Sequence, residues 1–100
     1  MTLDELTAAL KAKAALAPRL GYRVKFDLVG EGVVMWDGTG DQPEITNADG
    51  SADTTIAISG EDLEKLMRGD LNPTLAYMTG RLKVEGSMGV AMKVNQLLED

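Results

Sequence analysis

Residues 80–98 read GRLKVEGSMGVAMKVNQLL, and this stretch contains the change of periodicity that decides the fold. At its start, Leu82 and Val84 alternate with charged residues, which is typical of a strand with one buried face. Ser87 is then followed by apolar residues at helical spacing, so it predicts the N-cap of a helix that continues to about Leu98. A short strand that leads directly into an apolar helix predicts a sheet with helices packed against it.

The residues before this stretch add further helices and strands at the same two periodicities. Apolar spacings of three and four predict helices over residues 3–17, between Ser59 and Gly69, and between Asn72 and Gly80. Alternating or short apolar runs predict strands over residues 22–28, 33–36, 44–47 and 54–59. The first two strands are separated by a short glycine-containing turn, which favours an antiparallel hairpin. We therefore expect a single α+β domain over residues 1–100, with a mainly antiparallel sheet covered on one face by helices.

The composition removes most of the side chains that catalyse reactions or bind metals. The chain has no histidine and no cysteine, so the commonest general acid or base and the thiolate ligands are missing. Its serines, Ser51, Ser59 and Ser87, occupy turn or helix-cap positions, and none lies in a G-x-S-x-G motif. The segment 47–50 has the glycine of a calcium loop but lacks the two end carboxylates. We expect no enzymatic activity, no metal site and no cofactor.

The charge is unevenly distributed along the chain. The net charge is −6, which argues against a nucleic-acid partner. Residues 1–25 carry five bases and two acids, whereas residues 26–64 carry ten acids and no base. These acids either keep turns and strand edges solvated or form an acidic docking face. An acidic N-terminus, and the lack of an apolar run long enough to span a bilayer, favour a soluble cytoplasmic protein with at most transient membrane contact.

Methionine is concentrated near the C-terminus, at Met67, Met78, Met88 and Met92. Its unbranched, polarisable side chain adapts to irregular gaps and to ligands of varied shape. Apolar residues also cover two sides of the last helix, which leaves Lys93, Asn95 and Gln96 as its polar surface. Spacing alone favours plain core packing over a ligand-lined cavity, and both interpretations remain open at this point.

Residues 71–73 (LNP) and 76–93 (AYMTGRLKVEGSMGVAMK) resemble the C-terminal signature of the sterol carrier protein type-two domain family. In that family, a Gly-x-Leu-x-(Ile/Val)-x-Gly strand runs directly into a methionine-containing helix. The likeness extends upstream through residues 52–59 and 61–63 to 69–71, in the same order. The resemblance implies a five-stranded sheet with helices on one face, which together enclose a hydrophobic tunnel for fatty acids, fatty acyl-CoA, phospholipids or sterols.

The inward-facing pattern and the resemblance together identify candidate lipid-binding residues. We expect the cavity to be lined by Phe26, Met35, Leu75, Met78, Leu82, Met88, Ala91, Met92 and Leu97. An anionic head group would need a cationic mouth, for which the basic residues Arg19, Arg23 and Lys25 are candidates; ordinary solvated charges are the alternative. Family members often carry a tryptophan on the first strand, whereas the only tryptophan here, Trp36, lies one strand later.

The sequence thus predicts lipid binding and intracellular lipid carriage, with a lipid or fatty acyl ligand as the main partner. The competing interpretation is a non-catalytic accessory or docking module of a lipid- or quinone-handling complex. In that case residues 26–64 would form the acidic face that meets a protein partner.

Overall fold

The computed structural model describes residues 1–98, so the last two residues of the expected domain, 99–100, lie outside the described part. Its helices are α1 (Leu3–Leu16), α2 (Gly60–Met67), α3 (Pro73–Met78) and α4 (Met88–Leu98). Its strands are β1 (Arg23–Leu28), β2 (Gly32–Asp37), β3 (Glu44–Thr46), β4 (Thr54–Ile58) and β5 (Leu82–Gly86). The expected α+β class and order of elements are confirmed.

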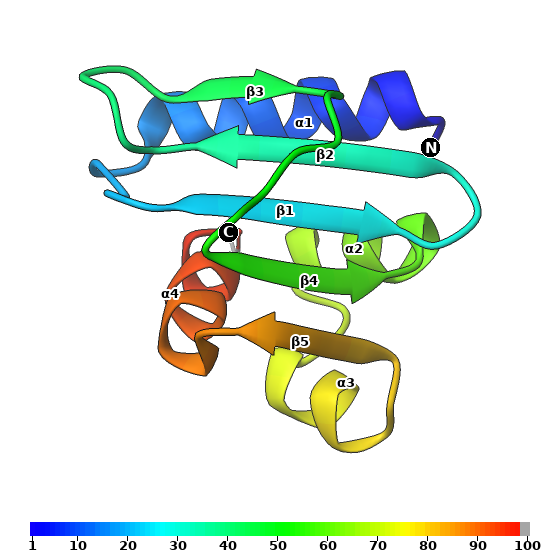
Figure 1. The fold of residues 1–100 in the computed structure, drawn as a ribbon. Coiled ribbons are helices and arrows are strands. Elements are labelled where there is room, and N and C mark those ends of the chain that lie inside the picture. Colours follow the sequence, from blue (N-terminus) through cyan, green and yellow to red (C-terminus); the bar gives the residue numbers. More distant parts are fainter. Residues whose placement is uncertain (99–100) are drawn as a thin grey trace.

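The strands form one five-stranded sheet in the order β3-β2-β1-β4-β5. All neighbouring pairs are antiparallel except β1 and β4, which run parallel at the centre of the sheet. This parallel pair arises because the chain leaves β3, crosses β2 and β1 as an open loop, and enters β4 beside β1 (Figure 1). The sheet is therefore mixed, although it is mostly antiparallel as predicted.

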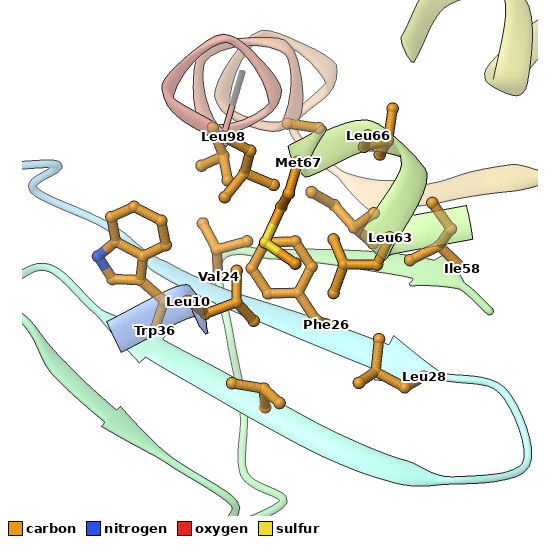
Figure 2. Close-up of a cluster of buried hydrophobic side chains, with 14 of the residues drawn as sticks. Leu10, Val24, Phe26, Leu28, Trp36, Ile58, Leu63, Leu66, Met67 and Leu98 are labelled. Atoms are coloured by element: carbon orange, nitrogen blue, oxygen red, sulfur yellow. The ribbon is translucent and has the colours of Figure 1, made fainter. Parts of the chain in front are cut away.

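Helices α1, α2 and α4 lie on one face of the sheet, while α3 lies beside β5 at its edge (Figure 1). Alternate residues of the strands point toward these helices, so Val24, Phe26 and Leu28 of β1 enter the core. Figure 2 shows Met67 extending from α2 toward Val24 and Phe26. Trp36 is the register partner of Val24 and is also buried, so the indole occupies the same side of the sheet as the first strand's core residues.

The start of α4 is fastened to β4 by a reciprocal pair of hydrogen bonds. The Ser87 N–H donates to Thr54 Oγ1 at 3.0 Å, and the Thr54 hydroxyl donates to the Ser87 carbonyl at 3.1 Å. Ser87 Oγ in turn accepts from the Val90 N–H at 3.2 Å, which confirms Ser87 as the predicted N-cap. Because Thr54 is buried, these bonds lie mostly out of water and hold the strand-to-helix junction in place.

A bidentate ion pair connects α2 to the turn before β5. The Arg81 guanidinium donates to both carboxylate oxygens of Asp62, at 2.6 and 3.2 Å. These hydrogen bonds from Arg81 lower the pKa of Asp62 below its usual value, and the same contact raises the pKa of Arg81. The pair positions the α3–β5 turn relative to α2.

We expect Arg81→Gln to lower the urea midpoint of unfolding at neutral pH, since the variant leaves Asp62 without its bidentate partner. A carboxyl whose pKa is lowered by folding stabilises the protein above its unfolded pKa, and this contribution is lost as pH falls through the lowered folded value. The difference in urea midpoint between wild type and variant should therefore become smaller below about pH 4. Urea titrations across this pH range test the prediction.

Arg68→Gln is the matched control for Arg81→Gln. Arg68 pairs with Glu64 and Asp70, each at 3.4 Å, and is itself 57% exposed, a type of contact that contributes little to stability. We expect it to change the urea midpoint less than Arg81→Gln. If the urea midpoint of Arg81→Gln stays equally far below that of wild type down to acid pH, the lost stability does not come from the Asp62 carboxylate.

Candidate functional site

Two sides of helix α4 are covered by other parts of the protein. One side packs into the core, and a pocket lies next to the other side. One face packs into the core through Val90, Ala91, Val94 and Leu98. The adjoining face looks toward the first turn of α3, where a pocket of about 230 Å³ lies between the two helices. This pocket is lined by Asn72, Pro73, Thr74, Met92, Asn95 and Gln96.

Asn95 is the unusual residue of this pocket. Asn95 is only 2% exposed, and within residues 1–98 neither its Nδ2 nor its Oδ1 has a hydrogen-bond partner. Its predicted position on the polar surface of the last helix is therefore wrong. Asn95 follows Ala91 by four residues and Met92 by three, so helical spacing puts it on their apolar side. A lone amide at such a position is the signal that the sequence analysis missed.

The predicted lipid-binding residues divide into four groups in the structure. Phe26, Leu82 and Ala91 are fully buried in the core between sheet and helices. Met92 and Leu97 are half-buried on α4, and Met92 lines the pocket.

Leu75, Met78 and Met88 were expected to point inward, and the structure corrects this. Their exposed fractions are 55%, 75% and 38%. Helix α3 is only six residues long and buries Ala76 alone, so Leu75 and Met78 face away from the sheet. Met88 is the first residue of α4 and lies at the surface before the helix reaches the core.

Met35 was expected to line the same cavity as Phe26, and this prediction is wrong. Successive strand residues point to opposite faces, and Val34, the partner of Phe26, takes the helix-covered face. Met35 pairs instead with Lys25 on the other face, where it is buried near Gly50 of the β3–β4 loop. The apolar run around Met35 does not reveal by itself which residues face the helices.

The basic residues proposed for a head-group mouth have local partners and do not line the α3–α4 pocket. Arg19 donates to the Thr39 carbonyl at 2.7 Å, and Arg23 pairs with Asp37 at 3.2 Å. Lys25 donates to Asp49 at 2.8 Å, which holds the β3–β4 loop against the sheet. Since β1 alternates, Arg23 and Lys25 lie on the sheet face opposite the helices. The structure does not bring these three residues to the site on α4.

Within residues 1–98, no group of three or more acidic side chains is arranged to hold a metal ion. In the same range, no helix is both long and apolar enough to cross a membrane.

Solved structures with the same arrangement define the class as the sterol-carrier type of α+β domain. The sterol carrier protein domain 2 of Helicoverpa armigera has a TM-score of 0.68, with 24% identity over 96% of this chain and 72% of that chain. The ubiquinone synthesis protein UbiJ-SCP2 has a TM-score of 0.73, with 20% identity over 95% of this chain and 90% of that chain. At these identities the likeness shows a shared fold.

The chain belongs to the SCP-2 sterol transfer family, whose model matches residues 3–99. This confirms the resemblance carried by residues 71–93. Sterol carrier protein 2 of Oryctolagus cuniculus is 47% identical over 53 residues, which are 53% of this chain and 10% of that protein. The chain thus spans about a tenth of the length of this curated relative.

Proposed function

We propose that this protein binds a lipid between its sheet and its C-terminal helices and carries it through the cytoplasm. The proposed ligands are a fatty acid, a fatty acyl-CoA, a phospholipid or a sterol. The observation that carries the proposal is the pocket between α3 and α4, because α4 also packs in the apolar core of a sterol-transfer-family domain. Met92 lines this pocket, and its neighbour Ala91 is fully buried in the core.

The weak attachment of α3 supplies the route for such a ligand. Ala76 is the one buried residue of this helix, so moving α3 away from β5 exposes little apolar surface. Met92 and Leu97 are half-buried, and the unbranched side chain of Met92 can adapt to an incoming chain. We propose that α3 moves outward, that the acyl chain passes Met92, and that Phe26, Leu82 and Ala91 form the inner wall.

The exposed apolar residues Leu75, Met78 and Met88 have a different proposed role. They lie at the surface of α3 and α4, the helices before and after β5 in the chain, where they would contact a membrane or a lipid while the ligand enters. Burying about a dozen methylenes contributes on the order of 10 kcal/mol gross. Association costs of about 4 to 15 kcal/mol offset much of this gain, so release stays feasible and carriage is favoured over storage.

Native mass spectrometry of the purified protein, followed by lipid extraction, tests this function. We expect a co-purified lipid, or saturable binding of a fluorescent fatty acid that is displaced by unlabelled lipid. A protein that carries no lipid and does not bind the fluorescent fatty acid would contradict lipid carriage.

Met92→Gln is expected to weaken binding of the fluorescent fatty acid about fivefold. The substitution keeps the length and helix propensity of the side chain but places an amide on the apolar path. Leu16→Gln is the control, because Leu16 at the end of α1 is 90% exposed and does not line the pocket. It should change the dissociation constant by less than about twofold, since an exposed apolar side chain loses little on becoming polar. Equal losses in the two variants would argue against this path.

A second candidate function is a docking module, and one specific observation favours it. The protein shares its fold with UbiJ-SCP2, which is described as a ubiquinone synthesis protein. In residues 26–64, Asp27, Asp41 and Glu44 are exposed and make no ion pair within the described part of the chain. These carboxylates would meet a basic surface on the partner. Co-purification of a stable protein complex without bound lipid would support docking over carriage.

A further inference from the structure

The buried amide of Asn95 has no structural role that its surroundings explain. A buried polar group without a partner is destabilising, and nearly all such groups in folded proteins are paired. Among the partners available in the described part of the chain, Asn95, which lines the α3–α4 pocket, leaves both a donor and an acceptor unused. Leu98, one turn further on the same side of α4, shows that an apolar side chain packs on this side.

We propose that Asn95 is the polar anchor of the lipid site and binds an uncharged head group that both donates and accepts hydrogen bonds. Alcohol hydroxyl, primary amide and protonated carboxyl groups have this chemistry, and each would satisfy Nδ2 and Oδ1 together. The inference rests on the proposed lipid-binding function and adds the class of head group to it.

The surroundings of Asn95 disfavour a charged head group. The other residues that line the pocket are Asn72, Pro73, Thr74, Met92 and Gln96, and none of them is ionisable. Arg19, Arg23 and Lys25, the basic residues first considered for this role, are bonded elsewhere. A phosphate or carboxylate placed beside Asn95 would lose its hydration without gaining a counter-charge, which costs several kcal/mol per ion.

The test compares two isomeric neutral probes, n-decanol and methyl nonyl ether, by displacement of a bound fluorescent fatty acid. Both have the same number of heavy atoms and accept hydrogen bonds, but only the alcohol donates one. We expect wild type to prefer the alcohol about tenfold, because one satisfied hydrogen bond in a buried site contributes about that factor. In Asn95→Leu this preference should fall about fivefold or more.

Stability provides a second readout, which separates a binding role from a structural one. Without ligand, Asn95→Leu should raise Tm by about 4 to 8 °C, because it removes an unsatisfied buried amide at similar volume. If the branched leucine does not fit, Asn95→Met serves as the second variant, with a flexible side chain of similar size. A fall in Tm for both variants would indicate a structural role for Asn95 and overturn the proposal.

Gln42→Leu is the control, because Gln42 is an exposed amide in the loop between β2 and β3 and does not line the α3–α4 pocket. It should keep the alcohol preference within about twofold, since water already solvates its amide. Wild type and Asn95→Leu could both bind the fluorescent fatty acid and prefer n-decanol over the ether equally. In that case Asn95 is not the head-group anchor, although the protein still binds lipid. If wild type binds neither the fluorescent fatty acid nor n-decanol, the proposed function itself fails.

Discussion

Replacing Phe26 with alanine is expected to lower the free energy of unfolding by about 4 kcal/mol, the usual cost of removing a buried phenyl ring. Phe26 is fully buried on the central strand β1, with Val34 and Ile56 as its register partners on either side. Figure 2 shows its ring at the centre of the core, with Met67 of α2 extending toward it. The cavity would therefore open where the sheet meets α2, and backbone hydrogen bonds on both sides of β1 limit its collapse.

Urea denaturation followed by far-ultraviolet circular dichroism measures this effect. Tyr22→Ala is the control, because Tyr22 directly precedes the same strand but is 42% exposed. We expect the control to cost about 1 kcal/mol or less, as surface substitutions usually do. Similar losses for the two variants would mean that Phe26 is not at the centre of the core.

Gly86→Ala is expected to cost about 3 kcal/mol, from backbone strain together with a steric overlap. Gly86 has a φ of +99°, in the left-handed region that disfavours a side chain. A Cβ atom here would also overlap the carbonyl oxygen of Asp53 and press on Thr54. Because Thr54 forms the reciprocal hydrogen bonds with Ser87, a shift of β4 would also disturb the start of α4.

Gly80→Ala separates the two contributions at Gly86. Gly80 has a φ of +78°, but a Cβ atom there meets nothing within 4 Å, so only the backbone strain applies. We expect this control to cost about 1 kcal/mol. Thermal and urea unfolding of both variants provide the comparison, and equal costs would show that the close approach of Gly86 to Asp53 is unimportant.

The two glycines also explain why the motif around β5 is informative in the sequence. Gly80 ends the turn that follows α3, and Gly86 lets β5 pass close to β4 before Ser87 starts α4. Each residue of this segment satisfies a local requirement of backbone angle, alternation or helix capping. Such requirements depend on near neighbours in the chain, so the bounds of β5 and α4 could be predicted from the sequence to within one or two residues.

The candidate site was predicted less completely, and particular residues show why. Met35 belongs to an apolar run with no alternation, so the face it occupies depends on pairing with β1. Leu75 and Met78 have the spacing of a buried stripe, but α3 lies at the sheet edge and turns them to solvent. Arg19, Arg23 and Lys25 bind carboxylate or carbonyl groups on segments that are distant in sequence, and these contacts cannot be read from the residues around them.

The sequence by itself determined the class of fold, the order of its elements, the caps of its helices and membership in the sterol-transfer family. These follow from periodicity and from motifs in which each residue acts on its near neighbours. Only the tertiary structure decided that β1 and β4 run parallel, that Met35 faces away from Phe26, and that Asn95 is buried with no partner among residues 1–98. Each of these depends on which distant segments meet, because long-range packing and strand register set the faces and the burial of side chains.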